Sequence, residues 1–417
     1  MLFISRLLYQ TSLGLYRAGI GLWAMLGNEK AQKWVKGRKD WSSPLAAAVS
    51  SLPAGPRIWL HAASLGEFEQ GRPVLEAIRQ QWPHCQIILT FFSPSGYEQQ
   101  KDFQAAAVVA YLPLDTPANA AKFLDIVAPQ AALFVKYEFW YFYLQALHQR
   151  RIPTLLFSAA FRQEQSFFKW YGALFRQMLS WYHTIQVQDE KSLSLLQQLQ
   201  LPQPVELGGD TRYDRVLAIA AQAASFEKIE AFKERYSLMI AGSTWPADES
   251  LLAAWLQQRP PNWKLVLAPH EINEAHLQSI EKLFGASAIR YSAFTGAEKH
   301  PVLIIDNIGM LSSLYRYGDI AFIGGGFASS GIHNTLEPAV FGLPVIMGPH
   351  YEKFSEARLL VEKGFAFPVK NTMELNTAFK HLAQQASVLR PVIKSAIATQ
   401  AGATGKVLAW LRAHLPL

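Results

Sequence analysis

Short, continuously apolar runs that alternate with helical stretches constrain this chain most. From about residue 57 onward, helical stretches such as 71–81, 117–127 and 139–149 separate these runs. Because successive positions in each run are apolar, the runs suit parallel strands that are covered by helices on both faces. The pattern predicts one doubly wound α/β domain. Its strands are expected at IWLHAA (58–63), QIILTFF (86–92), VVAYL (108–112), AALFV (131–135), TLLFSAA (154–160), TIQVQ (184–188) and VELGG (205–209).

The same rhythm restarts after an Ala-rich, charged segment. This predicts a second α/β domain, so we expect two Rossmann-like domains that face a cleft, where ligands bind in such folds. The second set of runs is LMIAGS (238–243), KLVLAPH (264–270), VLIID (302–306), IAFIGGG (320–326) and LPVIMG (343–348). The expected division is an N-terminal segment at 1–41, a first domain at 42–215, a linker at 216–235, a second domain at 236–395 and a C-terminal helix at 396–417 that can pack on the first domain.

Most of the positive charge lies at one end of the chain. The 417 residues carry a net charge of +7, while residues 1–41 alone hold seven basic and two acidic residues. A protein that binds nucleic acid through its body spreads basic residues over that body, so we expect no nucleic-acid partner. The single cysteine, Cys85, excludes a disulfide framework and any cysteine-based zinc site.

The N-terminal segment has the pattern of a membrane anchor. Residues 2–26 read as an apolar helix that contains Arg6 and Arg17, and a basic stretch follows at 30–39. Such a segment can span a bilayer or lie in the plane of an anionic membrane surface. By the positive-inside rule, the rest of the chain is expected on the cytoplasmic side. A buried core helix with a solvated basic loop is the alternative.

A second segment, 161–183, interleaves aromatic with basic residues. The pattern predicts a helix that rests on a membrane interface or binds an acidic lipid; alternatively, the helix packs into the core with its cations extended to solvent.

A glycine cluster in the second domain points to a nucleotide. Gly325 and Gly326 follow a buried strand, and a helix is expected to begin near Asn334 or Thr335. Glycines let a backbone approach a phosphate, and a helix N-terminus offers unpaired N–H groups. Glu337, in the first turn of that helix, can accept hydrogen bonds from the two hydroxyls of a ribose. The alternative is a tight turn with a capping carboxylate, but the neighbouring HNxLEP motif, with His333, favours the nucleotide.

Other strand ends of this domain are expected at the same edge of the sheet. Ser243 and Thr244 follow one strand and are suited to contact a phosphate or a sugar, and Pro269 and His270 end the next. A helix then opens at Gly309, Met310 and Leu311, where backbone groups can read the edge of a base.

Three charged residues of the first domain are candidates for chemistry. Glu67 lies on a strand–glycine–helix turn, where a carboxylate can deprotonate a hydroxyl or simply stabilise the helix start. His61 is a rival base. Glu138 and Arg212 follow two other strands. Each of them can be a structural ion-pair member. For Arg212 the functional alternative is a cation beside a departing phosphate. The chain has no HExxH, DxD, GxSxG or P-loop motif, so we expect no metal and no cofactor.

These motifs, in this order, resemble those of the 3-deoxy-D-manno-oct-2-ulosonic acid (Kdo) transferases. They are HAASLGE, YEFW, GDTRYDRV, GSTWPADE, APHE and GGGF…GIHNTLEPAVFGLPVIMGPH. The resemblance implies a GT-B fold, with an acceptor-binding first domain and a second domain that binds the CMP-sugar. It also implies metal-independent, inverting transfer of Kdo from CMP-Kdo to a lipid A precursor, lipid IVA, in lipopolysaccharide synthesis at the cytoplasmic face of the inner membrane.

The resemblance assigns roles residue by residue. Glu67 matches the general base, and Glu138 and Arg212 match positions that stabilise the transition state. The CMP contacts fall at Pro269, His270, Gly309, Met310, Leu311, Asn334, Thr335, Leu336 and Glu337.

This chain departs from the family pattern at three positions. Lys136 replaces the first of two glutamates, His270 follows Pro269 where many members have Arg, and Arg212 replaces Lys.

Two alternative functions are compatible with a fold of this kind. A nucleotide-sugar 2-epimerase shares such a fold but needs no membrane anchor, and a non-catalytic membrane-tethered binding protein needs neither Glu67 nor the complete HNxLE loop.

Overall fold

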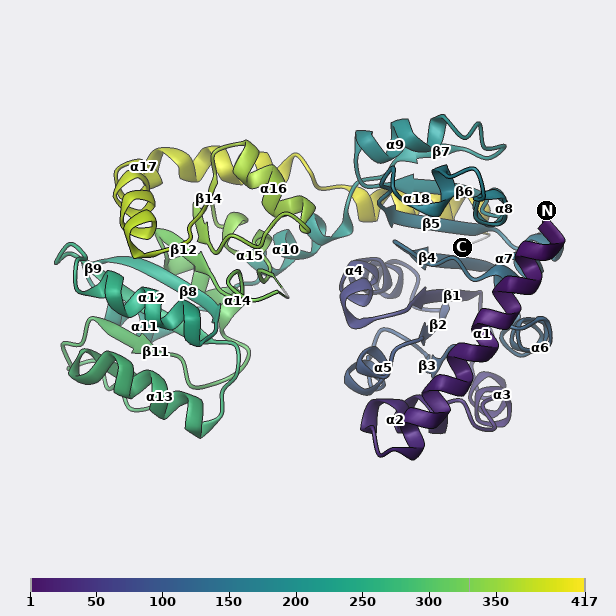
Figure 1. Cartoon of the computed structure of the whole chain (residues 1–417), viewed down its shortest axis with the longest axis horizontal. Coiled ribbons are helices and arrows are strands. Elements are labelled where there is room, and N and C mark those ends of the chain that lie inside the picture. The colour runs from purple at the N-terminus through teal and green to yellow at the C-terminus, as the bar shows by residue number, and fades with distance from the viewer. Residues whose placement is uncertain (1, 330, 416–417) are drawn as a thin grey trace. The chain divides into compact units, whose positions relative to one another are not determined.

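The computed structural model describes residues 2–329 and 331–415. It consists of two compact units (Figure 1), and we describe each by itself. Unit 1 comprises the residues up to 215 together with those from 401 onward, and unit 2 comprises residues 216–400. The doubly wound α/β prediction is confirmed for both, because each contains a seven-stranded sheet in which every pairing is parallel.

In unit 1 the strand order is β3-β2-β1-β4-β5-β6-β7. Each of the seven predicted apolar runs forms one strand. The strands are β1 (Arg57–Ala62), β2 (Gln86–Phe91), β3 (Val108–Tyr111), β4 (Ala131–Val135), β5 (Thr154–Ala159), β6 (Thr184–Val187) and β7 (Val205–Leu207).

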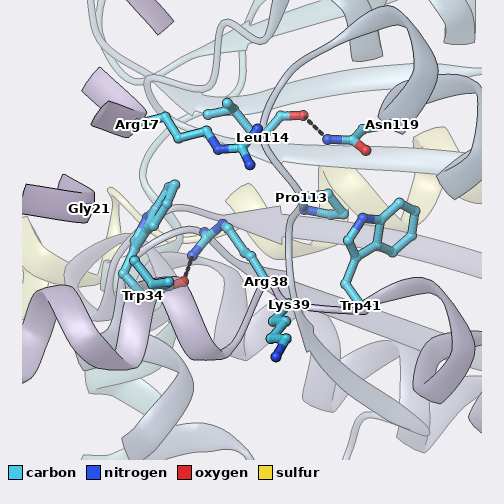
Figure 2. A pocket seen from close by; sticks show the side chains of 10 residues that line it. Arg17, Gly21, Trp34, Arg38, Lys39, Trp41, Pro113, Leu114 and Asn119 are labelled. Carbon is cyan, nitrogen blue, oxygen red and sulfur yellow. Dashed lines mark hydrogen bonds between the residues drawn. The ribbon is translucent and has the colours of Figure 1, made fainter. Parts of the chain in front are cut away.

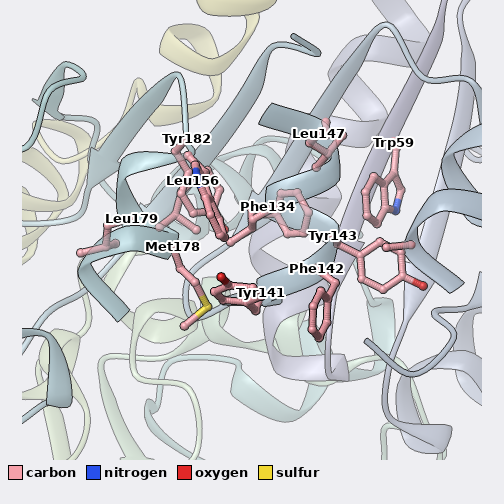
Figure 3. Packing of buried hydrophobic residues seen from close by; sticks show 14 of the residues in the cluster. Trp59, Phe134, Tyr141, Phe142, Tyr143, Leu147, Leu156, Met178, Leu179 and Tyr182 are labelled. Carbon is pink, nitrogen blue, oxygen red and sulfur yellow. The ribbon is translucent and has the colours of Figure 1, made fainter. Parts of the chain in front are cut away.

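Helices cover both faces of this sheet. They are α1 (Leu2–Met25), α2 (Glu29–Lys36), α3 (Ser42–Ser50), α4 (Leu65–Gln81), α5 (Pro94–Gln100), α6 (Pro117–Val127), α7 (Tyr141–Gln149), the 3-10 turn η1 (Ser166–Phe168), α8 (Ala173–Ser180), α9 (Glu190–Gln197), α10 (Thr211–Ala221) and α18 (Ala403–His414). On one face, Trp59 and Phe134 of β1 and β4 pack against Tyr143 of α7 (Figure 3). On the other face, α18 places Val407 and Leu411 in a core shared with α4. Side chains that emerge on both faces of the strands are therefore buried.

Unit 2 has the strand order β10-β11-β9-β8-β12-β13-β14. Its strands are β8 (Ser237–Thr244), β9 (Trp263–Pro269), β10 (Ala288–Arg290), β11 (Val302–Ile304), β12 (Ile320–Ile323), β13 (Val345–Met347) and β14 (Ala366–Pro368). Its helices are α11 (Glu227–Lys233), α12 (Pro246–Leu256), α13 (Glu274–Phe284), η2 (Gly285–Ser287), α14 (Leu311–Leu314), η3 (Tyr315–Tyr317), α15 (Leu336–Ala339), α16 (Ser355–Glu362) and α17 (Thr372–Ala398). Two edge strands, β10 and β14, were not predicted.

Two segments differ from the prediction. The continuous helix expected at 161–183 is wrong, because only η1 and α8 are helical there. Most of its aromatic residues fill the core, whereas Trp170 is 84% exposed. The segment 216–235, expected to be a linker, holds the end of α10 and the whole of α11, whose Ile229 and Phe232 are buried in unit 2.

The N-terminal helix α1 lies along unit 1, where Tyr9 donates a hydrogen bond to Asp115 (2.6 Å). Much of its apolar surface is exposed, including Leu15 and Leu22. Among the described residues, no helix has both the length and the apolar character needed to cross a bilayer.

Candidate functional site

Each sheet has a central position where the strand order reverses direction. In unit 1 it lies between β1 and β4, and in unit 2 between β8 and β12. Helices that leave neighbouring strands at such a position depart to opposite faces, so a crevice opens beyond the carboxyl ends of the strands. In unit 1, Glu67 and Glu138 come directly after β1 and β4, and in unit 2, Ser243 and Gly325 lie at the ends of β8 and β12. Arg212 and His270 follow the other strands β7 and β9.

Glu67 occupies the third position of α4, directly after β1. Its Oε2 accepts hydrogen bonds from the backbone N–H of Ser64 (3.0 Å) and from the Ser64 hydroxyl (3.1 Å), and Ser64 Oγ accepts from the N–H of Glu67 (3.4 Å). This reciprocal pair is a capping box, which satisfies N–H groups that the helix start leaves unpaired. The structural role considered for Glu67 is therefore present, and it fixes the carboxylate at the end of the strand.

Glu138 follows β4 and is buried. Its carboxylate accepts a hydrogen bond from Trp140 Nε1, and its Oε2 lies 3.0 Å from Nε2 of the fully buried His61. Lys136, two residues earlier, has a left-handed φ of 63° that turns the chain out of β4 and brings Glu138 back over the sheet edge.

Glu67 and Glu138 form one carboxyl pair. The pKa of Glu67 is raised to about 7, mainly by burial and in part by the neighbouring Glu138, through its charge and a hydrogen bond between the two side chains. Burial likewise raises the pKa of Glu138 to about 7, against hydrogen bonds from Trp140, Glu67 and the backbone of Ala63 that favour the carboxylate. Two adjacent carboxylates do not both ionise readily, so the pair titrates as a unit near neutral pH.

His61 belongs to this site, although its place beside Glu138 was not predicted. Burial lowers its pKa to about 3, so the imidazole is neutral. Trp59 Nε1 donates to Thr90 Oγ1 (2.8 Å), and the Thr90 hydroxyl lies 2.8 Å from His61 Nδ1. Nδ1 also lies 3.1 Å from the Thr90 carbonyl oxygen, which only accepts, so that contact puts the imidazole hydrogen on Nδ1, whereas a Thr90 hydroxyl that donates to Nδ1 puts it on Nε2. In the sequence, the contact between His61 and Glu138 was indicated only by the sheet edge at which both residues were expected.

Arg212 lies in the first turn of α10 and is held by Asp210. Its Nε and Nη2 donate to Asp210 Oδ2 at 2.9 and 2.7 Å, and its backbone N–H donates to Oδ1 at 2.9 Å. The ion pair considered as the structural role is therefore real. The same guanidinium acts electrostatically on Tyr137, whose hydroxyl pKa is raised by burial, lowered by Arg162 and Arg212, and raised again by Glu67. Tyr137 thus lies within electrostatic reach of both Glu67 and Arg212.

Unit 2 has a cavity of about 350 Å³ beyond β8 and β12. Seven predicted donor residues line it: Ser243, His270, Gly309, Leu311, His333, Asn334 and Glu337. Ser312, Tyr315 and Ile323 complete the lining and were not predicted. Ser243 has a φ of 54°, and this left-handed conformation, unusual for a serine, turns the chain at the end of β8.

Two histidines and a tryptophan stack beside this cavity. The His270 ring stacks on Trp245, with ring centroids 4.8 Å apart, and on His333, with ring centroids 4.4 Å apart. Trp245 Nε1 also donates to His333 Nε2 (3.1 Å), which assigns the hydrogen of a neutral His333 to Nδ1. Burial lowers the pKa of His333, and His270 lowers it further. Trp245 was part of the GSTWPADE motif but was not singled out.

Asn334 organises the start of α15. Its Oδ1 accepts from the N–H of Leu336 (3.0 Å), while its Nδ2 donates to Glu337 Oε1 (3.2 Å). Glu337 in turn acts on the buried Tyr315, whose pKa is raised well above its usual value, mainly by burial. The Glu337 carboxylate therefore lies in the cavity lining and is held there by Asn334, while its contact with a ribose stays a prediction.

Other predicted donor residues lie in the framework behind the cavity rather than among its lining residues. Thr244 donates to the buried Glu249 (3.0 Å), and Thr335 and Leu336 are fully buried. Pro269 and Met310 are buried as well. Their contact with a nucleotide stays a prediction.

The glycine cluster has a packing role that the phosphate interpretation did not include. The N–H of Gly325 donates to Asp248 (2.9 Å), so it is already occupied. A Cβ on Gly325 would lie 2.7 Å from Gly331 O, and one on Gly326 would lie 2.7 Å from Gly348 Cα. These glycines let backbone segments approach each other closely, which is the tight-turn alternative.

In the described part of the chain, no three His, Cys, Asp or Glu side chains form a group that could hold a metal ion.

Comparisons with known proteins bear on both units. Residues 33–215 match the family model for 3-deoxy-D-manno-octulosonic-acid transferase (kdotransferase). The transferase of that name from Aquifex aeolicus is 30% identical over 332 residues, which cover 78% of this chain and 85% of the relative. The one from Haemophilus influenzae is 30% identical over 79% of this chain and 78% of its own length.

Solved structures share the fold at low sequence identity. UDP-GlcNAc 2-epimerase from Neisseria meningitidis superposes with a TM-score of 0.57 at 14% identity, over 81% of this chain and 94% of the epimerase. MurG from Acinetobacter baumannii gives 0.55 at 13% identity, over 86% of this chain and 99% of MurG. At this identity the likeness concerns the two-Rossmann fold of the GT-B type. On the sequence matches, this chain belongs to the 3-deoxy-D-manno-octulosonic acid transferase family.

Proposed function

We propose that the chain transfers Kdo from CMP-Kdo to the lipid A precursor lipid IVA, without a metal ion and with inversion at the anomeric carbon. The observation that carries the proposal is the Glu67–Glu138 pair, which places a carboxyl group with a pKa near 7 at the reversal point of the unit 1 sheet. A general base works best when its pKa lies near the operating pH. Membership of the transferase family supports the reaction class.

The donor is assigned to the unit 2 cavity. Glu337 at its wall can accept hydrogen bonds from ribose hydroxyls, and His333, whose Nδ1 carries the hydrogen of the neutral ring, is a second polar group of the same lining. Ser243 brings a hydroxyl to the same cavity, suited to a phosphate oxygen. These groups fit a nucleoside monophosphate better than a purely apolar ligand.

The proposed step moves one proton and one sugar. An acceptor hydroxyl gives its proton to the Glu67 carboxylate while its oxygen forms a bond to the anomeric carbon of Kdo. The bond from that carbon to the phosphate oxygen breaks, and CMP leaves with the electron pair. Attack from the side opposite the departing CMP inverts the carbon. Arg212, with its guanidinium fixed by Asp210, is assigned to the negative charge that develops on the phosphate.

The inner-membrane location belongs to the same proposal. On α1, Leu15 is 70% and Trp23 63% exposed, and the basic helix α2 follows. An exposed apolar face beside basic residues suits a helix that lies in the plane of an anionic membrane surface. We assign the chain to the cytoplasmic face of the inner membrane, where the basic residues favour the cytoplasmic side.

The direct test is incubation of the purified chain with CMP-Kdo and lipid IVA, followed by mass spectrometry of the lipid. The lipid should gain the mass of at least one Kdo residue. Glu67→Gln should abolish the gain while CMP binding, measured by calorimetry, persists. Glu69→Gln removes a neighbouring carboxylate of the same helix and should leave the transfer intact. A wild-type chain that adds no Kdo would refute the proposal, and full turnover by Glu67→Gln would refute the role of Glu67.

A further inference from the structure

The segment that carries Glu138 runs into the start of α7, which is held by groups from elsewhere in the chain. Trp140 occupies the N-cap position of α7, and its side chain forms no cap hydrogen bond there. Its Nε1 donates instead to the Glu138 carboxylate. Because the first N–H groups of a helix have no partner within the helix, those of α7 need acceptors from another part of the molecule.

Asp115, from the loop between β3 and α6, caps α7. Its Oδ1 accepts hydrogen bonds from the N–H groups of Phe142 (3.1 Å) and Tyr143 (3.0 Å), the second and third residues of the helix. A carboxylate in this position also stabilises the positive end of the helix dipole. Asp115 is fully buried, and burial raises its pKa to about 6, against hydrogen bonds that favour the carboxylate. At neutral pH Asp115 is therefore ionised.

The loop that carries Asp115 is itself fixed beside α1. Figure 2 shows Pro113 and Leu114, the two residues before Asp115, in the wall of a cavity of about 390 Å³ that α1 also lines. The Leu114 carbonyl accepts a hydrogen bond from Asn119 Nδ2 (2.9 Å). The Pro113 carbonyl accepts one from the Tyr143 hydroxyl (3.2 Å). These bonds hold the Asp115 carboxylate at the start of α7 and next to α1.

Tyr9 of α1 completes the cap. Its hydroxyl donates to Asp115 Oδ2 (2.6 Å) and accepts from the N–H of Tyr141 (3.5 Å), the first residue of α7. Burial, and after it the charge of Asp115, raise the pKa of the Tyr9 hydroxyl, so this donor keeps its proton. Arg6, one turn earlier, lies over the ring of Phe142, 5.2 Å from the centroid. The three leading N–H groups of α7 thus depend on Asp115 and on one residue of α1.

We propose that Tyr9, through Asp115, is a positioning residue for the Glu67–Glu138 pair. With the start of α7 fixed, Trp140 keeps its hydrogen bond to Glu138, and Glu138 stays beside Glu67. The helix α1, for which a membrane contact is proposed above, then also supports the site. The inference rests on the proposed role of Glu67 in the transfer, but the arrangement it describes can be measured without turnover.

The groups around the pair determine the sign of the expected change. His61, Tyr137 and Tyr182 also act electrostatically on the pair. Burial keeps the imidazole neutral and raises the pKa of both tyrosine hydroxyls, so none of these three changes charge near pH 7. Glu138 is the neighbour that raises the pKa of Glu67, by its charge and by a hydrogen bond. When Glu138 becomes neutral or moves away, the pKa of Glu67 should therefore fall.

Infrared titration of the full chain tests the positioning without donor or acceptor. Each spectrum is compared with that of the same chain carrying Glu67→Gln, so the difference reports the carboxyl pair. Tyr9→Phe keeps the ring and removes the hydroxyl, and the midpoint of Glu67 should move about half a unit to lower pH. Added to Glu138→Gln, Tyr9→Phe should cause no further change. Tyr16→Phe removes a half-exposed hydroxyl from the same helix and should leave the midpoint in place.

Two results would overturn the proposal. One is an unchanged midpoint in a Tyr9→Phe chain that circular dichroism shows to be folded. The other is a shift of the same size in the Glu138→Gln background, because Tyr9 would then loosen the site without acting through Glu138. If Tyr9→Phe does not fold, Asp115→Asn, which keeps the size of the side chain and one acceptor oxygen, takes its place with the same expected shift.

Kdo transfer by the same variants is measured separately. On the alkaline plateau, Tyr9→Phe should lower kcat about threefold, because a base with a lower pKa accepts a proton less readily. The KM for CMP-Kdo should not change, since the candidate donor cavity belongs to unit 2. A wild-type chain that transfers no Kdo would refute the proposed function and leave the infrared result standing, whereas an unchanged infrared midpoint in an active Tyr9→Phe chain would refute the positioning alone.

Discussion

At the scale of single residues, the Glu67–Glu138 pair shows how a helix cap becomes a candidate base. Glu67 is tied to Ser64, as a capping residue should be, yet it also touches a second, buried carboxyl group. The nearest nitrogen base, His61, supplies no positive charge, because burial keeps its imidazole neutral. Burial is the largest cause at the pair, so the pKa values of both carboxyl groups rise.

The pair predicts how activity depends on pH. Glu67 must be ionised to accept a proton, so kcat/KM should rise as the pH increases through about 7, the value to which its pKa is raised. Glu138→Gln removes the negative neighbour, so the pKa of Glu67 should fall and the midpoint of the profile should move about one unit to lower pH. A pH profile of both proteins measures the shift. Glu69→Gln is the matched control, and a midpoint that Glu138→Gln leaves in place would contradict the coupling.

At the scale of elements, strands were predicted well where the core imposes a continuous apolar run. β10 and β14 were missed although β7, β11 and β13 are equally short: β10 ends on the charged Arg290, and β14 ends on Pro368, a residue that argues against a strand. The segment 161–183 was misread because its aromatics follow no single face. Phe161 is buried from a loop and Phe167 from the 3-10 turn η1, and Arg176 donates to the carbonyls of Phe167 and Lys169 instead of extending to solvent.

The candidate site was predictable only as far as strand ends could be located. Residues at the ends of β1, β4, β8 and β12 were expected to gather, because parallel strands share an edge. Which side chain faces a cavity depends on rotamers and backbone turns, and the sequence does not encode these locally. Thr244, for example, turns inward to Glu249, whereas Ser243, one residue earlier, lines the cavity. The partnership of His61 with Glu138 joins residues far apart in the chain.

The turn after β12 predicts a sharp effect of one methyl group. In Gly326→Ala the new Cβ would lie 2.7 Å from both N and Cα of Gly348, and a backbone cannot yield as a flexible side chain does. We expect a loss of about 1–3 kcal/mol in the free energy of unfolding, with weaker CMP binding. Gly405→Ala in α18 meets nothing within 4 Å and should be neutral or slightly stabilising. Urea unfolding measures both, and equal stability of the two variants would contradict the packing role.

At the scale of the whole molecule, two cores are joined by few crossings of the chain. The chain passes from unit 1 to unit 2 within α10 and returns at residues 400 and 401. Each unit has its own parallel sheet and its own buried clusters. The carboxyl pair belongs to unit 1 and the candidate donor cavity to unit 2, so the proposed base and the proposed nucleotide site depend on different cores.

This division predicts how CMP affects thermal unfolding of the full chain. Calorimetry should show two transitions, because separate cores can melt separately. CMP at about 100 times its Kd should stabilise the unit it binds by about 2.7 kcal/mol, which raises only the transition of unit 2 by several degrees. Gly326→Ala identifies that transition by lowering it. Glu337→Gln should abolish the CMP shift without removing the transition, whereas Glu138→Gln, in unit 1, should leave the CMP shift unchanged. A CMP shift in both transitions, or one that survives Glu337→Gln in full, would show that nucleotide binding is not confined to the unit 2 cavity.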